Sequence, residues 1–170
     1  DQLALTSQQR AAAAQAAGKF KDEIAVVSIP QRKGEPVVFA EDEYIKANTS
    51  LESLTKLRPA FKKDGSVTAG NASGINDGAA AVLMMSADKA AELGLKPLAR
   101  IKGYAMSGIE PEIMGLGPVD AVKKTLNKAG WSLDQVDLIE ANEAFAAQAL
   151  GVAKDLDLVL DKVYVNCGTI

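Results

Sequence analysis

Acid–base and metal chemistry are restricted on this chain, because none of its 170 residues is a histidine. Histidine is the commonest proton carrier near neutral pH and the commonest metal ligand, so its absence predicts no metal site. The single cysteine, Cys167, lies in an apolar stretch near the end of the chain. A thiol in that setting is more often a small buried side chain than a nucleophile, so Cys167 is a weak catalytic candidate.

Two carboxylates flank an amide at Glu140, Asn142 and Glu143. They fall where a short apolar strand at residues 136–139 leads into an alanine-rich helix predicted over residues 142–156. The ends of parallel strands commonly form a site, which favours a functional role. An asparagine or glutamate at a helix start can equally cap that helix, and the residues alone leave both interpretations open.

Two glycine-containing stretches, residues 70–78 and 114–118, invite comparison with phosphate-binding loops. Neither matches a dinucleotide fingerprint, because the first precedes a predicted strand instead of following one. In the second, Pro118 removes one backbone donor. Small residues in these stretches are better explained by the close approach of a ligand or a second backbone segment.

A group of basic residues lies between positions 46 and 63 of a chain whose formal net charge is −3. Glu52 is the acidic residue among them, and the basic members are Lys46, Lys56, Arg58, Lys62 and Lys63. One interpretation is a solvated face, which is usual for scattered lysines. The other is the mouth of a site that attracts an anionic ligand.

Composition excludes several classes of partner. The negative net charge and the lack of a long basic run argue against nucleic acid and anionic membranes. No apolar run approaches the roughly 20 residues of a membrane span, and one cysteine cannot form an intrachain disulfide. We therefore expect a cytoplasmic protein that binds small molecules or copies of itself. The chain starts without a signal peptide and stops in a predicted strand, so both ends are expected to be cut from a longer protein.

The first half must position the basic group with few regular elements. Helix formers predict a helix at residues 3–17 that Gly18 ends, and β-branched runs predict a pair of short strands at 23–29 and 37–39. The breakers Pro59 and Gly65 predict an irregular segment at 42–70, with a short helix near 51–57.

The second half is predicted to alternate strands and helices, as in a layered α/β domain with helices covering a sheet. The expected strands are residues 79–85, 98–104, 136–139 and 163–165. The expected helices run from a cap at Ser86 to Gly94, from Gly117 to Gly130, and over residues 142–156.

Three segments together match a known family in order and spacing. They are TAGNASGINDGAA at residues 68–80, MGLGPV at 114–119 and ANEAFAAQAL at 141–150, and the stretch KLRPAFKKDGSVTAGN at 56–71 agrees with them. The chain thus resembles the biosynthetic-type thiolases, the acetyl-CoA acetyltransferases, along its whole length.

The resemblance implies a thiolase-like layered α/β fold, in which each of two similar domains is a sheet sandwiched by helices. A loop domain inserted in the first domain receives coenzyme A. In this chain, residues 1–75 would be part of the loop domain and residues 76–96 the end of the N-terminal domain. Residues 97–170 would be the first half of the C-terminal domain, so the fold would be partial.

The resemblance also implies a division of the chemistry. In the family a cysteine takes the acetyl group as a thioester, a histidine activates it, and a second cysteine abstracts a proton from acetyl-CoA. The nucleophile would precede Asp1, and the other two would follow Ile170. Asn142 carries over as the residue that orients a water to stabilise the enolate oxygen. Ala144, Phe145 and Met114 would line the pocket near the thioester.

For coenzyme A, which acts as a substrate and not as a permanently bound cofactor, the resemblance implies a set of contacts around the nucleotide and the pantetheine arm. They are Lys46, Ser53, Phe61, Ala69, Ser73 and Ile75. Relatives often carry arginine followed by histidine where this chain has Lys46 and Ala47. One polar contact to the nucleotide is therefore expected to be lost or replaced.

The last eight residues depart from the family pattern VNVNGGAI at Tyr164, Cys167 and Thr169. Cys167 adds a Cβ where glycine is expected, and Tyr164 is far larger than asparagine, which predicts an altered floor of the active site.

The leading hypothesis is a portion of an acetyl-CoA C-acetyltransferase, an acyltransferase that condenses two acetyl-CoA molecules to acetoacetyl-CoA and coenzyme A. The chain alone is expected to be inactive, and the intact parent to be a homodimer or homotetramer. The alternatives are a non-catalytic module that binds coenzyme A and a structural partner of a complete thiolase.

Overall fold

The computed structural model describes residues 1–163 and residue 166. The chain divides into two units, one formed by Asp1–Ser73 with Asp137–Ile170 and the other by Gly74–Val136. The predicted closing strand at residues 163–165 and the departures at Tyr164, Cys167 and Thr169 lie outside the described residues, except for Val163.

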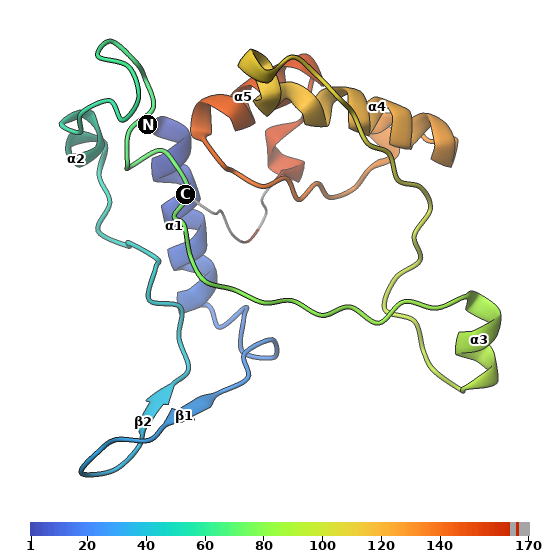
Figure 1. The fold of residues 1–170 in the computed structure, drawn as a ribbon, viewed down its shortest axis with the longest axis horizontal. Coiled ribbons are helices and arrows are strands. Elements are labelled where there is room, and N and C mark those ends of the chain that lie inside the picture. Colours follow the sequence, from blue (N-terminus) through green and yellow to red (C-terminus); the bar gives the residue numbers. More distant parts are fainter. Residues whose placement is uncertain (164–165, 167–170) are drawn as a thin grey trace. The chain divides into compact units, whose positions relative to one another are not determined.

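The first unit is built around α1, Gln2–Ala16 (Figure 1). Alanine and glutamine favour a helix here, and Gly18 ends it with a φ of 67° that a residue without Cβ adopts freely. The buried positions Ala4, Ser7, Gln8, Ala11 and Ala14 follow a helical spacing of three or four. The predicted helix at residues 3–17 is confirmed.

Beyond α1, a hairpin joins β1, Val27–Ile29, to β2, Val37–Phe39. The strands are antiparallel, with Val27 opposite Phe39 and Ile29 opposite Val37. Figure 1 shows the hairpin projecting past the end of α1. The predicted strand pair is therefore confirmed, although its apolar side chains remain exposed.

The short helix α2, Leu51–Thr55, is fixed by a reciprocal cap in which the Ser50 and Ser53 side chains each bond the other's backbone N–H. Its one buried side chain, Leu54, packs with Ala4 of α1 and Ala146 in the core of this unit. The helix predicted near residues 51–57 is confirmed.

The last helix of the first unit, α5, spans Ala146–Asp155 and buries Ala146, Ala149 and Val152. The predicted start at residue 142 is wrong, because Phe145 has an extended backbone and pairs with Ala72 in an antiparallel bridge. Beyond α5 comes the short 3-10 helix η3, Leu160–Lys162. Val163 then bridges Ile139 in parallel, which leaves only a trace of the strand predicted at 136–139.

The second unit contains α3, Ala87–Glu92, and α4, Gly117–Ala129. The Ser86 hydroxyl accepts the N–H of Lys89 and caps α3. Gly94 and Gly130 follow the two helices with φ of 65° and 69°. Both helices are therefore confirmed, with their predicted caps and stops. Two 3-10 helices complete the unit, η1 at Pro111–Leu116 and η2 at Leu133–Gln135.

The strands predicted at residues 79–85 and 98–104 are wrong for this structure. Both segments run without regular structure, and their large apolar side chains, such as Val82 and Ile101, are exposed. A strand needs a neighbour to take its backbone hydrogen bonds, and the described residues of this unit supply none.

No helix in the described part of the chain has the length and apolar character needed to cross a membrane.

Candidate functional site

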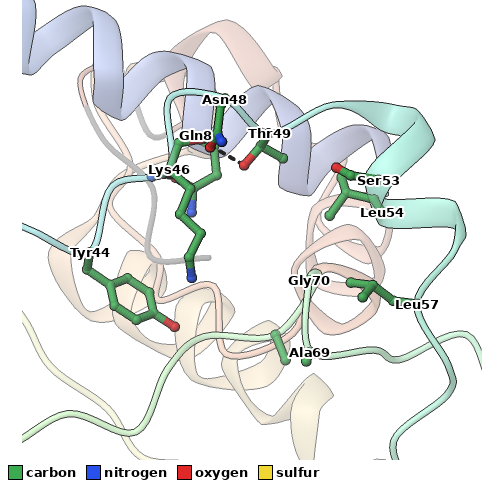
Figure 2. A pocket seen from close by; sticks show the side chains of 11 residues that line it. Gln8, Tyr44, Lys46, Asn48, Thr49, Ser53, Leu54, Leu57, Ala69 and Gly70 are labelled. Carbon is green, nitrogen blue, oxygen red and sulfur yellow. Dashed lines mark hydrogen bonds between the residues drawn. The ribbon is translucent and has the colours of Figure 1, made fainter.

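A cavity of about 310 Å³ opens in the first unit between α1, α2 and the loops around residues 44–49 and 69–72 (Figure 2). Its lining is mixed, with polar groups opposite small and aliphatic ones. The residues are Gln8, Tyr44, Lys46, Asn48, Thr49, Ser53, Leu54, Leu57, Ala69, Gly70 and Ala72.

Lys46 is the cation of this cavity, and its backbone is held at both ends. Gln8 Oε1 accepts the Lys46 N–H at 2.7 Å, and the Thr49 hydroxyl donates to the Lys46 carbonyl at 2.8 Å. The ammonium lies 4.9 Å from the centre of the Tyr44 ring, a favourable cation–π distance. Figure 2 shows the side chain extending beside Tyr44 into the cavity. The arrangement offers an exposed positive charge to an anion.

The opposite wall depends on a glycine. A Cβ at Gly70 would lie 2.5 Å from Leu57 Cδ1 and 2.6 Å from Leu54 Cδ2. A side chain at this position would displace the two leucine side chains, so glycine lets the loop backbone lie close against them.

Asn71 shapes the same loop from inside. Its side chain accepts the Thr68 N–H at 2.8 Å and donates to Asp1 Oδ1 and the Ser66 carbonyl, each at 2.9 Å. Because Asn71 is only 6% exposed, these bonds replace water that the amide has lost. The loop from residue 66 to 72 is therefore fixed at its centre.

The loop continues directly onto the segment that carries Asn142. The Ser73 N–H donates to the Ala144 carbonyl at 3.0 Å, and the Ala146 N–H donates to the Asn71 carbonyl at 2.9 Å. The Ser73 hydroxyl adds a 3.3 Å bond to the Ala144 carbonyl. These bonds surround the bridge of Ala72 with Phe145 and place the two segments side by side.

Phe61 extends this contact. Its ring meets that of Phe145 edge to face, with centroids 6.0 Å apart, although Phe61 is 75% exposed. The pair gives the segment before α5 an apolar flank that remains open to a ligand.

Asn142 and Glu143 have opposite environments. Asn142 is exposed, whereas Glu143 is 1% exposed and accepts the Ser7 hydroxyl of α1 at 2.7 Å. Neither residue stands at the N-cap position of α5, which is occupied by Phe145. The interpretation of Asn142 or Glu143 as the N-cap residue of this helix is therefore wrong.

A second cavity of about 560 Å³ lies between α1, the segment after it and the end of β2. Its lining includes the carboxylates of Glu23, Glu41 and Asp42 and no lysine or arginine, so it does not suit an anion. Among the described residues, no group of three or more histidine, cysteine, aspartate or glutamate side chains could hold a metal ion.

Two family models match the chain, that of the thiolase N-terminal domain over residues 1–88 and that of the thiolase C-terminal domain over residues 95–170. The chain belongs to the thiolase family. The resemblance stated from the three motifs is thus confirmed.

Its thiolase relatives include the acetyl-CoA acetyltransferases of Chromobacterium violaceum and Pseudomonas aeruginosa. They are 69% and 60% identical over 170 residues, which is all of this chain and 43% of each relative. The chain therefore spans less than half the length of these thiolases.

Solved thiolase structures follow the same backbone course. The Bacillus anthracis acetyl-CoA acetyltransferase matches with a TM-score of 0.93 and 52% identity, over 99% of this chain and 43% of that one. A human mitochondrial 3-ketoacyl-CoA thiolase in complex with CoA matches with a TM-score of 0.91 and 51% identity, over 99% and 41%. These matches confirm the predicted partial thiolase-like α/β fold, while the finer domain boundaries at residues 75 and 96 stay predictions.

Three of the residues expected to contact coenzyme A in a thiolase, Lys46, Ser53 and Ala69, line the smaller cavity together. Phe61, Ser73, Ala144 and Phe145 meet around the bridge instead. Ile75 and Met114 belong to the second unit and are exposed there.

Members of the basic group at residues 46–63 lie in different environments. Lys46 lines the cavity, whereas Lys56 pairs with Glu52 on the surface, where both side chains are largely exposed. The solvated-face interpretation therefore holds for Lys56, and the interpretation as the mouth of an anion site remains for Lys46.

Sequence reasoning missed several lining residues of this thiolase cavity, namely Gln8, Tyr44, Asn48, Thr49 and Leu57. Tyr44 could have been found from its position two residues before the lysine. Gln8 gave a weaker signal, as a polar residue on the helix face that becomes buried.

Proposed function

We propose that this chain is the part of an acetyl-CoA C-acetyltransferase that binds coenzyme A and stabilises the enolate. The reaction is the reversible Claisen condensation of two acetyl-CoA molecules to acetoacetyl-CoA and coenzyme A. The observation that carries the proposal is the pairing of residues 71–73 with residues 144–146. It joins the loop of an anion-accepting cavity to the segment that bears an exposed amide.

Coenzyme A is an anionic, elongated substrate, and residues of the chain are assigned to each of its parts as the resemblance to thiolases implies. Lys46 supplies positive charge for the nucleotide end, and Ser53 and Ala69 lie in the same cavity. Ser73, Phe61 and Ile75 are assigned to the pantetheine arm. Ala144, Phe145 and Met114 are assigned to the walls around the thioester.

Asn142 is assigned to the reacting end. An amide donor acting through a water stabilises the negative charge that develops on the thioester oxygen when acetyl-CoA loses a proton. A chain without histidine supplies no histidine to activate a nucleophile. The histidine is therefore assigned to another segment of the enzyme. The resemblance to thiolases assigns the nucleophilic cysteine and the base to other segments as well, and the chain alone is expected to be inactive.

The intact enzyme is proposed to act in the cytoplasm as a homodimer or homotetramer. The exposed apolar segments of the second unit support burial against further protein.

A chimera tests the proposal. The chain replaces the matching 170 residues of the Chromobacterium violaceum acetyl-CoA acetyltransferase, and the thiolysis of acetoacetyl-CoA is measured. We expect an active chimera in which Asn142→Ala lowers kcat by about 100- to 1,000-fold.

A folded chimera that binds coenzyme A without thiolysis would contradict the catalytic proposal and favour the non-catalytic binding module. A folded chimera that neither binds nor reacts would contradict both. Size-exclusion chromatography of the chimera beside the parent enzyme reports folding and assembly.

A further inference from the structure

We propose that Glu143 is a positioning residue for Asn142, anchored by the Ser7 hydroxyl of α1. This inference rests on the proposed function of Asn142 and adds a residue to it. It starts from a carboxylate that is 1% exposed directly beside an exposed amide.

A buried carboxylate has to be held by hydrogen bonds, because it has lost its water. The Ser7 hydroxyl donates to Glu143 Oε2 at 2.7 Å, across 136 positions of the sequence. Bonds from a hydroxyl to a charged oxygen are among the stronger hydrogen bonds in proteins. Ser7 is itself only 3% exposed, so the bond ties α1 to the segment before α5 inside the first unit.

The segment around Glu143 cannot be oriented by helical bonds, since α5 begins only at Ala146. On one side of Glu143 the backbone is held at Ala144, which accepts the Ser73 N–H, and at Ala146. On the other side lies Asn142. The two neighbouring side chains have opposite environments, with Glu143 buried inside the unit and Asn142 exposed. The bond that holds the Glu143 side chain inside the unit therefore also fixes the backbone from which Asn142 projects.

The test uses the chimera described above with Ser7→Ala and Glu143→Ala. Each variant is expected to lower kcat by about 10- to 100-fold, because the amide of Asn142 is displaced from the reacting oxygen. In thiolysis, the KM for coenzyme A should stay within about twofold, because the cavity around Lys46 is untouched. Glu143→Gln keeps an oxygen that accepts the hydrogen bond from the Ser7 hydroxyl, so its kcat should fall less than that of Glu143→Ala.

Thr6→Ala is the matched control. Thr6 precedes Ser7 on α1, and among the described residues its hydroxyl bonds within that helix, to the Gln2 carbonyl at 3.0 Å. This variant should leave kcat and KM unchanged. An unchanged kcat in Ser7→Ala, or a loss of the same size in Thr6→Ala, would overturn the positioning role.

Hydrogen–deuterium exchange of this chain separates the two proposals. Ser7→Ala should speed exchange of the Ala146 and Ser73 amides, and Thr6→Ala should not. If the unmodified chimera is inactive, the proposed function fails. Faster exchange in Ser7→Ala would then still support the anchoring of the segment by Ser7 and Glu143, and unchanged exchange would overturn it.

Discussion

The backbone N–H of Ser73 donates to the carbonyl of Ala144 at 3.0 Å, and the Ser73 hydroxyl reaches the same oxygen across 71 positions of the sequence. Two motifs that are distant along the chain are joined there by both a main-chain and a side-chain donor. The proposed coenzyme A loop and the proposed enolate-stabilising segment therefore share one hydrogen-bonded junction.

Lys46→Ala should weaken coenzyme A binding by about tenfold, because the charge-assisted contact in the cavity is lost. Isothermal titration calorimetry measures the affinity of each chain for coenzyme A. The affinity of the unmodified chain should also fall as salt is added, because salt screens the charge of Lys46. Lys56→Ala is the matched control, since Lys56 is paired with Glu52 on the surface. Equal losses in the two variants would show that Lys46 has no special role.

Gly70→Ala should destabilise the chain by about 1–3 kcal/mol, because the new Cβ overlaps methyl groups of Leu54 and Leu57. Urea unfolding followed by circular dichroism measures the change. Gly78→Ala is the control, since a Cβ there meets nothing within 4 Å. The steric argument fails if both substitutions leave the free energy of unfolding unchanged.

The Phe61 and Phe145 rings should show a coupling energy of about 0.5–1.5 kcal/mol in a double-mutant cycle with leucine substitutions. The edge-to-face contact at 6.0 Å is the source of this coupling. Urea unfolding of the four chains provides the measurement. Additive losses would mean that the two rings act independently.

In the second unit, the pKa of the Asp120 carboxyl lies below its ordinary value of 3.8, because the Lys124 ammonium and then the Ser107 hydroxyl bond to its charged form. A lowered pKa in the folded chain stabilises it above pH 3.8, and this contribution is lost as the pH falls through the folded-state pKa. Lys124→Ala and Ser107→Ala should each raise the Asp120 pKa toward its ordinary value. Carboxyl NMR titration tests this, and a pKa of 3.8 in the unmodified chain would refute it.

Helices were predictable from local signals, because their hydrogen bonds close within the segment. Gly18 and Gly130 stop α1 and α4 where the sequence predicts, and Ser86 caps α3. The strands at residues 79–85 and 98–104 failed for the opposite reason. An apolar run identifies a segment that favours burial, but pairing depends on a neighbour elsewhere.

The candidate site was predictable only in part. Family motifs pointed to Lys46, Ser53 and Ala69, which share a cavity. Local sequence could not show that Gln8 of α1 would hold the backbone of Lys46. It also left Glu143 open between a cap and a functional group, because the decisive partner, Ser7, is 136 positions away.

Asn71 links the cavity loop of the first unit to the start of α5. Its side chain fixes the cavity loop, and its carbonyl accepts the first N–H of α5. One residue thus belongs to two sites. A ligand that favours this loop conformation therefore also stabilises the start of α5, and stabilising α5 favours ligand binding in return, because such linkage is reciprocal.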